Sequence, residues 1–270
     1  MVRLDKGHYL PVYENYRSGH FFFPLIGAVL LDEQDGVVFA DNAVAPKQIY
    51  VEHAFGFAQM FGESCPSFEE TLERYLLIDK KFSAPKARLY APCLPTFLSN
   101  PKYDSLRSFR QRFLIDPPDS SEALLAGAGL DSGLDAVDVD ARNLEEIGRL
   151  FDVVSRFWRS PEDFIRKAHA VVASYRGQPA CICYAAAEAD LKIEINVLTL
   201  PEYRNRGAGK FAVTHFVKRC FEQSLQPLWD CFTNNTGSMR LCRSIGFTAT
   251  HPPYPFFTIN RQPFSGDRRM

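Results

Sequence analysis

The feature that most constrains the fold is a strand, a glycine-containing loop and a helix in direct succession between residues 191 and 221. The run LKIEINVLTL (191–200) is apolar and ends at Pro201, which predicts a strand. From Gly207 onward, apolar residues recur at the four-residue spacing of an amphipathic helix. The loop between strand and helix contains Arg204, Asn205, Arg206, Gly207, Ala208 and Gly209.

A loop of this kind is expected to bind a phosphate or pyrophosphate. Small residues let the backbone approach a ligand, and the first N–H groups of a helix point outward at the positive end of its dipole. Arg204, Arg206 and Lys210 add three cations that can pair with phosphate oxygens. Taken alone, the two glycines can also serve only to relieve crowding between strand and helix. The sequence matches neither a Walker A loop nor a dinucleotide-binding fingerprint, which argues against both classes.

Length and charge restrict the class of partner. A chain of 270 residues fits two domains of ordinary size, and its 46% apolar residues are enough to bury a substantial core. The 31 basic and 32 acidic residues nearly cancel, so no global field favours nucleic acid or an anionic membrane. We therefore expect a small-molecule partner, with no nucleic acid and no membrane involved.

Cysteines and histidines indicate neither disulfides nor a metal site. The seven cysteines include an odd one and form no Cys-x-x-Cys pair, which favours reduced thiols in a cytoplasmic protein. The six histidines are scattered singly, so no metal is predicted. The charged first twenty residues lack the apolar core of a signal peptide, and no run has the roughly 18 apolar residues of a membrane span. A cytoplasmic location is expected.

A segment rich in Pro, Ser, Gly and Asp, at 116–135, separates two halves richer in aromatic and branched residues. We predict an N-terminal α/β domain over 1–120, a linker over 121–135 and a C-terminal domain over 136–270. No internal repeat is visible in the sequence, although the similar size of the halves leaves a diverged duplication open. In the first half we expect strands at 21–31 and 36–44 and helices at 49–62 and 68–82.

The second half has clearer element signals. A strand and a helix are expected within 134–151, followed by a short helix capped by Ser160. A hairpin follows, with its turn at Gly177, and the strand, loop and helix described above come next. The remaining predicted elements are a strand at 227–233, a helix at 238–247 and a strand at 254–259.

In several pieces, the second half resembles the GNAT superfamily of acyl-CoA-dependent N-acyltransferases. Arg204-x-x-Gly207-x-Gly209 is similar to the superfamily's Gln/Arg-x-x-Gly-x-Gly/Ala loop. Leu-Pro-Glu-Tyr (200–203) resembles the Pro-x-Tyr segment that usually precedes this loop. The segment from Asn235 to Phe247 looks like the second signature, an Asn-led helix that ends in Gly-Phe. The resemblance covers roughly 135–260. It implies a mixed α/β fold with a splayed central sheet flanked by helices, here preceded by a smaller α/β domain.

A finer pattern that includes Trp158, Glu194, Thr199 and Trp229 resembles the branch that contains the zwittermicin-resistance acetyltransferase. Members of that branch carry an extra N-terminal half, and the segment 27–42 looks like the opening of such a half. This likeness implies that the N-terminal domain shapes the acceptor pocket.

The resemblance also implies the donor site. The co-substrate is an acyl-coenzyme A, either acetyl-CoA or a short-chain acyl-CoA. In the family, the strand before the loop binds the pantetheine arm and polarises the thioester carbonyl. The implied coenzyme-binding residues are Leu198, Thr199, Leu200, Arg204, Asn205, Arg206, Gly207, Ala208, Gly209, Lys210, Asn235 and Ser238.

Glu194 is the predicted general base. It is an acidic residue in an otherwise apolar strand, ten positions before Arg204, and it can take the proton of the attacking amine directly or through water. The alternative is a strand residue whose side chain faces solvent.

The chain departs from the family at Cys242, where many members have a tyrosine that protonates the leaving thiolate. A cysteine can donate a proton, but one on an apolar helix face more often belongs to the core. Tyr254 is a second candidate acid. For His215 we expect a solvated side chain, and for His53 a structural role rather than a place in the substrate cleft.

The leading hypothesis is therefore an N-acyltransferase that acts on a small polar amine, such as an amino sugar, which can be nucleotide-linked, or an aminopolyol. One alternative is acetylation of a protein or peptide amine. Another is a CoA-binding sensor without catalysis. The sequence identifies neither the acceptor nor the acyl length, and it leaves a homodimer open.

Overall fold

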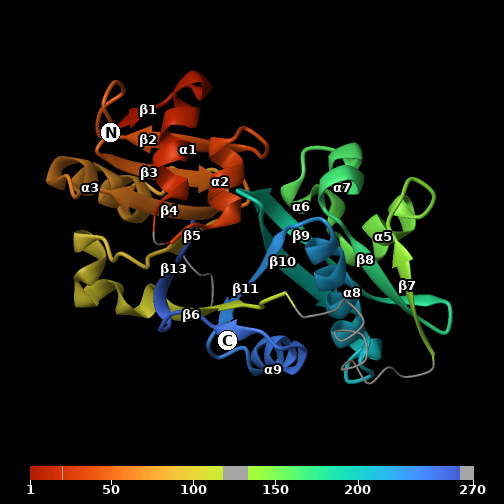
Figure 1. Cartoon of the computed structure of the whole chain (residues 1–270). Coiled ribbons are helices and arrows are strands. Elements are labelled where there is room, and N and C mark those ends of the chain that lie inside the picture. Colours follow the sequence, from red (N-terminus) through yellow and green to blue (C-terminus); the bar gives the residue numbers. More distant parts are fainter. Residues whose placement is uncertain (20, 118–132, 262–270) are drawn as a thin grey trace, which may run out of the picture. The chain divides into compact units, whose positions relative to one another are not determined.

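The computed structural model describes residues 1–19, 21–117 and 133–261, which form two compact units (Figure 1). The first unit comprises Met1–Arg110 and the stretch from Tyr254 onward, and the second comprises Gln111–Pro253. The second unit is thus inserted into the sequence of the first. These boundaries differ from the predicted 1–120 and 136–270, because the strand at 254–259 belongs to the first unit and not to the C-terminal domain. Most of the predicted linker lies outside the described residues.

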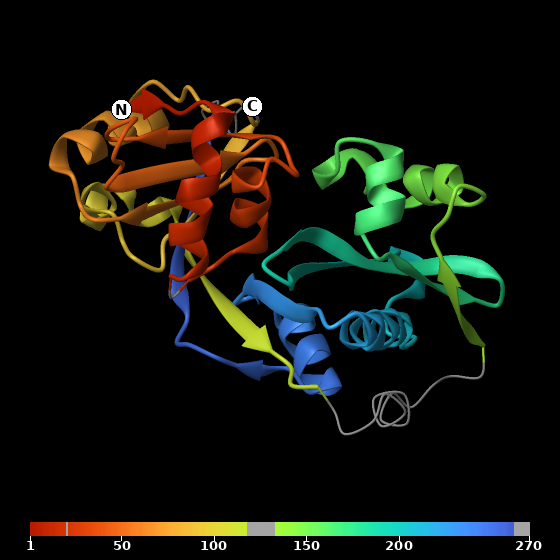
Figure 2. The same ribbon diagram turned by 45° about the horizontal axis from the view of Figure 1, so that its top comes forward.

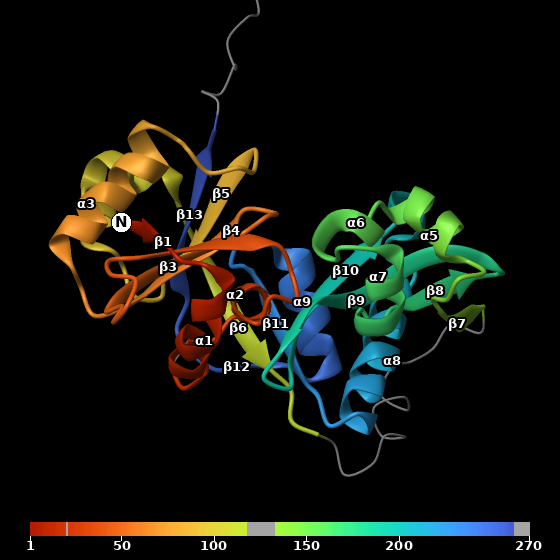
Figure 3. The ribbon, with the colours of Figure 1, turned by 90° about the horizontal axis from the view of Figure 1, so that it is seen from above.

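The first unit alternates helices with short strands. Its strands are β1 (Val2–Arg3), β2 (Gly36–Ala40), β3 (Gln48–His53), β4 (Phe57–Gly62), β5 (Lys86–Tyr90), the first part of β6 (Arg107–Leu114) and β13 (Tyr254–Asn260). Its helices are α1 (Tyr9–Arg17), α2 (Pro24–Leu30), α3 (Pro66–Glu73), a π turn at Arg74–Ile78 and 3-10 turns at Lys6–His8, Thr96–Ser99 and Pro101–Leu106. Figure 3 shows α3 on one face of this sheet and α1 and α2 on the other.

The sheet of the first unit is completed by a strand from the far end of the chain. Strands β1 to β4 pair antiparallel in sequence order, and β5 runs parallel to β4. Strand β13 then lies between β5 and β6, antiparallel to both. Its Phe257 and Ile259 join the core cluster under α3, whereas Phe256 packs near Tyr90 on the other face. Burial of these side chains is what fixes β13 in the sheet.

Two predictions in this unit are wrong. Residues 21–31 were expected to form a strand, but Pro24–Leu30 is helix α2; all seven residues are buried, so the sequence shows no helical period. Residues 49–62 were expected to form a helix, but they form the hairpin of β3 and β4. Its turn contains Gly56 at φ +90°, where a Cβ would lie 2.2 Å from the Lys86 carbonyl oxygen. The strand at Gly36–Ala40 and the helix that begins at Pro66 agree with the sequence analysis.

The second unit follows the predicted elements closely. Its strands are β7 (Leu134–Asp138), β8 (Val171–Tyr175), β9 (Gln178–Ala189), β10 (Lys192–Thr199), β11 (Gln226–Phe232) and β12 (Thr248–Ala249), together with the end of β6. Its helices are α5 (Leu144–Phe151), α6 (Val154–Phe157), α7 (Pro161–Lys167), the 3-10 turn Pro201–Tyr203, α8 (Ala208–Glu222) and α9 (Thr236–Ile245). Strands β7 to β10 are antiparallel, and β11 is parallel to β10. Figure 2 shows α8 on one face of this sheet and α5 to α7 on the other.

Local polar contacts fix the connections of the second unit. The Ser160 hydroxyl accepts a hydrogen bond from the Asp163 backbone N–H at 3.1 Å, as the predicted cap requires. The Trp158 indole N–H donates to the Ala185 carbonyl at 3.0 Å. Ala185 lies at a bulge in β9, where its register against β10 shifts between Glu194 and Ile195. The indole therefore satisfies a backbone acceptor next to the irregular part of the ladder.

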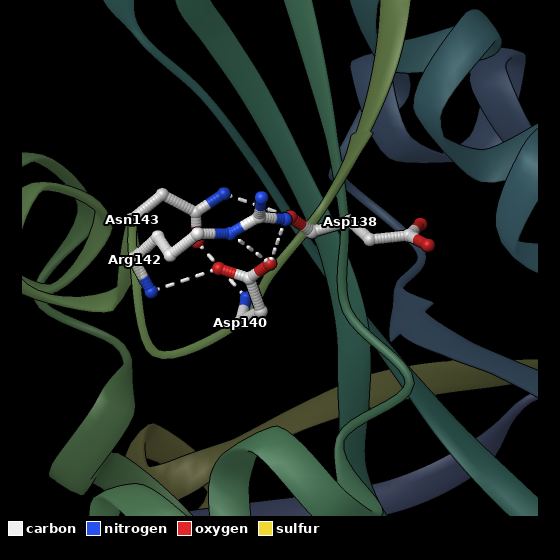
Figure 4. A network of polar contacts seen from close by, with 4 residues as sticks. All are labelled: Asp138, Asp140, Arg142 and Asn143. Atoms are coloured by element: carbon white, nitrogen blue, oxygen red, sulfur yellow. Dashed lines mark hydrogen bonds and ion pairs between the residues drawn. The ribbon is translucent and has the colours of Figure 1, made fainter.

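The loop between β7 and α5 is closed by the contacts drawn in Figure 4. The Asp140 carboxylate accepts hydrogen bonds from the backbone N–H and the guanidinium of Arg142, and these bonds lower the pKa of Asp140. Asn143 donates to the Asp138 carbonyl at 2.7 Å and accepts from the Asp140 backbone N–H at 3.0 Å. The Arg142 side chain is 91% exposed, so this network is a surface turn that starts α5.

The two units repeat one order of elements. Each has a short strand, helices, three further antiparallel strands, a helix and then a strand parallel to its predecessor. In each, three residue pairs are in register across the parallel strands. The last pair is Gln59 with Tyr90 in the first unit and Glu194 with Leu228 in the second. This shared topology is compatible with the duplication that the sequence left open, and by position in the topology Gln59 corresponds to Glu194.

Candidate active site

The central strands of the second unit separate at Glu194. Strand β10 is paired with β9 along its whole length, from Lys192 to Thr199. Its parallel pairing with β11 covers only Lys192 to Glu194, although β11 continues to Phe232. The part of β10 after Glu194 therefore has an edge without a ladder partner from β11. This is the splayed sheet that the resemblance to the GNAT superfamily implied.

The glycine loop lies beside this opening. Asn205 and Gly207 have positive φ values of 61° and 79°, and Gly207 is the residue before the first turn of α8. At Gly207 the positive φ favours glycine. Space is not the constraint there, because a Cβ would meet only a Leu134 methyl at 4.0 Å. At Gly209 space is the constraint, because a Cβ would lie 3.3 Å from the Thr199 hydroxyl. The loop thus starts α8 close to the end of β10.

A pocket of about 500 Å³ occupies this place, and we call it the second-unit groove. The end of β10, the glycine loop with the start of α8, and the start of α9 line it. Arg204 and Lys210 give it two cationic side chains, and no Asp or Glu is among its described lining residues. Its lining residues are Val197, Leu198, Thr199, Tyr203, Arg204, Asn205, Gly207, Ala208, Gly209, Lys210, Asn235, Gly237, Ser238 and Leu241.

The structure brings most of the predicted coenzyme-binding residues together here and leaves two out. The Arg206 guanidinium lies over the Tyr175 ring, 5.3 Å from its centroid, instead of lining the groove. The Leu200 backbone N–H donates to the Ala180 carbonyl at 3.0 Å, within the ladder to β9. Sequence reasoning missed Val197, Tyr203, Gly237 and Leu241, although each adjoins a motif residue.

Two predicted side chains have structural contacts at the start of α9. Asn235 caps the helix by accepting from the Ser238 N–H at 3.1 Å. The Ser238 hydroxyl in turn accepts from the Trp229 indole N–H at 3.1 Å, which ties α9 to β11. The Thr199 hydroxyl, at the end of β10, donates to the Cys181 sulfur at 3.2 Å. These contacts hold the walls of the groove in place.

Glu194 lies at the apex of the opening, on the last residue of β10 that is in register with β11. Alternation along β10 places its side chain on the face opposite Thr199. The residue is 6% exposed, so the alternative of a solvent-facing strand residue does not hold. It does not line the groove itself. The Glu194 carboxylate thus lies on one face of β10, and the Thr199 side chain, which lines the groove, lies on the other.

A buried ion pair lies on the other side of the opening. The Arg112 guanidinium of β6 and the Asp230 carboxylate of β11 are 3.6 Å apart, and their side chains are 8% and 1% exposed. Strand β6 is the neighbour of β11 on the side away from β10. The pair therefore joins β11 to β6 where β11 has left β10. Sequence reasoning missed this ion pair, because its partners are more than a hundred positions apart.

The candidate acids and histidines do not adjoin the groove. Cys242 is fully buried, and burial raises the pKa of its thiol to about 12, in agreement with a core role. Tyr254 packs against Phe23 and Tyr90 within the first unit. His215 is half-buried beside Phe211, and burial lowers its pKa. Burial also lowers the pKa of His53 to about 4, as expected for a structural, neutral histidine.

Among the described residues, no cluster of three or more His, Cys, Asp or Glu side chains is arranged to hold a metal ion. None of the helices in the described ranges combines the length and hydropathy of a membrane span.

Comparisons with known proteins cover both units. A family model described as GNAT acetyltransferase matches residues 24–257. An uncharacterized N-acetyltransferase of Bacillus subtilis, YdfB, is 26% identical over 91 residues, which is 34% of this chain and 35% of that protein; the match thus spans about a third of the relative.

Solved structures show the same fold. A GCN5-related N-acetyltransferase-like protein from Streptococcus suis superposes with a TM-score of 0.70 at 17% identity, over 95% of this chain and 100% of that one. A tandem GNAT protein from the clavulanic acid biosynthesis pathway superposes with a TM-score of 0.60 at 9% identity, over 97% and 98% of the two chains. The family model covers well over half of the sequence, and the splayed strands and the glycine loop agree with it. The chain therefore belongs to the GNAT acetyltransferase family and is an acyl-CoA-dependent N-acyltransferase.

Proposed function

We propose that the protein transfers an acetyl or short acyl group from acyl-CoA, bound in the second-unit groove, to the amine of a small polar acceptor. The observation that carries the proposal is the opening between β10 and β11. It has the cationic start of α8 on one side and a buried carboxylate, Glu194, at its apex.

The donor's pyrophosphate is assigned to the start of α8. The first N–H groups of a helix point outward at the positive end of its dipole, and here they include those of Ala208 and Gly209. The Arg204 and Lys210 side chains line the same groove and can each pair with phosphate oxygens. Charge and backbone geometry thus favour the same ligand.

The backbone of β10 indicates which amides can contact the thioester. In an antiparallel ladder, hydrogen-bonded pairs alternate with pairs that are not hydrogen-bonded. Leu200 donates to Ala180 in β9, so the backbone groups of Leu198 also point to β9. Those of Val197 and Thr199 then point into the opening. Of the three strand residues implied by the family, Leu198, Thr199 and Leu200, only Thr199 has a backbone N–H aimed at the groove. The other N–H aimed there belongs to Val197.

The chemical step is direct attack. The amine nitrogen adds to the thioester carbonyl carbon, and negative charge builds on the carbonyl oxygen. A fixed N–H aimed at that oxygen contributes about 3 kcal/mol to lowering such a barrier. The C–S bond then breaks, and the thiolate of CoA leaves and takes its proton from solvent. With a pKa of about 12, the Cys242 thiol is a poor acid for that role.

Glu194 takes the proton that the amine loses. An alkyl amine with a pKa near ~10 is almost wholly protonated at neutral pH, so a base that removes its proton increases the reactive fraction. We include amino sugars and aminopolyols as the acceptor class. The near-zero net charge of the chain, which offers no general attraction to a polymer, supports a small acceptor.

The test is release of free thiol from acetyl-CoA with a panel of amines: amino sugars, aminopolyols and lysine peptides. Glu194→Gln is expected to lower kcat/KM about 100-fold at pH 6, with a smaller loss at pH 9, where more amine is free. Glu188→Gln is the matched control, since it makes the same change on the neighbouring strand β9, where Glu188 pairs with His169.

The outcomes distinguish the proposed function from its alternatives. Equal losses in the two variants, or a loss with Glu194→Gln that does not depend on pH, would remove Glu194 from the mechanism. Turnover of lysine peptides alone would replace the small acceptor with a peptide. Binding of CoA without turnover of any amine would indicate a sensor.

A further inference from the structure

The first unit contains a cavity at the position that corresponds to the second-unit groove. It has a volume of about 730 Å³, and we call it the first-unit cavity. The groove follows the last registered pair of β10 and β11, and the cavity lies likewise beyond the last registered pair of β4 and β5. Its walls include the end of β4, the loop before α3 and the loop after β5; among these residues are Phe61, Gly62, Glu63, Ser64 and Cys93.

The features that suit a pyrophosphate are replaced in the cavity. Helix α3 starts after Cys65, whose φ of −125° is ordinary extended backbone, and its first residue is Pro66, which has no N–H. Glu69 occupies the first turn and lines the cavity with Glu63. A carboxylate in the first turn of a helix competes with a bound anion for the positive end of the dipole.

The charged side chains that line the first-unit cavity are mainly acidic, whereas those that line the second-unit groove are basic. The groove carries Arg204 and Lys210, whereas the cavity carries Glu63 and Glu69, with Lys47 as the one Lys or Arg among its described lining residues. Burial would raise the pKa of Glu69, but hydrogen bonds from Gln48, Ser64 and Thr96 outweigh it and hold the pKa low, so Glu69 is charged at neutral pH. An anionic coenzyme is disfavoured here, and a cation is favoured.

Aromatic rings complete the site. Tyr16 and Phe61 lie with their ring centroids 4.6 Å apart, and both line the cavity together with Phe21. Carboxylates and aromatic rings that line one cavity are the groups that recognise organic ammonium ions.

The counterpart of the predicted base is missing. Gln59 stands where the second unit has Glu194, and its carboxamide is engaged: the Oε1 atom accepts from the Tyr16 hydroxyl at 2.5 Å, and the Nε2 atom donates to the Phe21 carbonyl at 3.2 Å. A carboxamide does not act as a general base at neutral pH. We propose that the first-unit cavity binds an organic amine without acylating it, as a second ligand site in addition to the coenzyme groove of the second unit.

The cavity contains its own reporter. Cys93 lines it and is an exposed free thiol. The full-length protein is treated with iodoacetamide, and alkylation of each cysteine is followed by mass spectrometry, in the absence of acyl-CoA. Spermidine and glucosamine are the amine probes, N-acetylglucosamine is the neutral comparison and CoA the anionic one. Saturating amine is expected to slow alkylation of Cys93 at least about fivefold, whereas N-acetylglucosamine and CoA leave it unchanged.

Variants locate the effect. Phe61→Ala combined with Glu63→Gln alters partly or fully exposed residues and is expected to weaken protection of Cys93 at least about tenfold in the amine concentration required. Arg204→Ala, in the groove, leaves protection unchanged. The proposal is overturned if no probe amine protects Cys93, if protection survives the double variant, or if CoA protects Cys93. Because no acyl-CoA is present, these results are independent of whether the protein turns over any amine.

Discussion

The second-unit groove and the first-unit cavity have the same place in one order of elements and carry opposite charge. Around the groove, Gly207 frees the start of α8 for a ligand, and Arg204 and Lys210 surround it. Around the cavity, Pro66 and Glu69 occupy the start of α3. The comparison shows that the topology supplies an opening at the end of parallel strands, whereas a few side chains at a helix start decide what it can hold.

The largest expected effect comes from the strand that only the first unit receives from a distant part of the chain. Phe257 of β13 is fully buried, and Phe257→Ala is expected to lower the free energy of unfolding by ~3–5 kcal/mol, since it leaves a cavity in the core. Urea denaturation measures this change. Phe109→Ala, on β6 of the same unit, makes the same change at a residue that is 46% exposed. Similar losses in the two variants would mean that β13 is not anchored by its buried face.

Acid should destabilise the first unit through His53. Its Nδ1 atom accepts from the Phe55 N–H at 2.9 Å, so the folded ring is neutral, and burial lowers its pKa from 6.5 to about 4. As the pH falls below 6.5, the unfolded chain binds a proton that the folded chain does not, and stability is lost until about pH 4. The loss attributable to His53 is about 3 kcal/mol.

His53→Gln tests this pH dependence, because it removes the titrating group. The difference in unfolding free energy between the parent and the variant, measured by urea denaturation at pH 7 and pH 4.5, should shrink as the pH falls. A constant difference would show that His53 titrates normally. His215→Gln in the second unit is the matched comparison, and its smaller burial predicts a smaller change.

The charge of the groove is tested by two neighbouring arginines. Arg204→Ala is expected to raise the KM for acetyl-CoA about tenfold, since it removes a charged hydrogen-bond donor from the groove. Arg206→Ala is expected to change it less than about twofold, because Arg206 lies over Tyr175. Steady-state kinetics at fixed amine concentration compares the two. Equal effects would place Arg206 on the coenzyme and refute the assignment from the groove lining.

The smallest effect concerns the backbone at the start of α8. Gly207→Ala is expected to cost about 1 kcal/mol of unfolding free energy, because its φ of 79° strains any side chain. Gly237→Ala is the control, since a Cβ there meets only the Asn235 side chain at 3.7 Å and Gly237 lies within α9. Thermal unfolding distinguishes them. If Gly207→Ala left the free energy of unfolding unchanged, Gly207 would be required only to let the coenzyme come close to the backbone.

The sequence predicted the second unit well for identifiable reasons. The strand at 191–200 is an apolar run that ends at Pro201, the turn at Gly177 marks the hairpin, and Gly207 and Gly246 bound helices at positive φ. The motifs also brought most of the proposed coenzyme-binding residues to one groove. Arg206 and Leu200 were indistinguishable from their neighbours by motif, since a motif does not say which way a side chain or an amide points.

The first unit was predicted less well because its segments are buried on all sides. Helix α2 and strand β3 are both continuous apolar or buried runs, and neither shows a period that separates helix from strand. Gly56 offered a missed signal for the turn of the hairpin. The membership of β13 in the first unit has no local signature, because the sequence of a strand does not name its partners.

The return of β13 has a consequence for biosynthesis. A ribosome delivers residues 1–110, then the whole of the second unit, and only afterwards the strand that lies between β5 and β6. Domains generally fold as they emerge, from the N-terminus onward. In this chain the coenzyme-binding unit can be finished while the earlier unit still exposes the edges of β5 and β6. The edges of β5 and β6 therefore lack β13 between them until Tyr254–Asn260 has been made, and an exposed strand edge is a site for unwanted pairing with other chains.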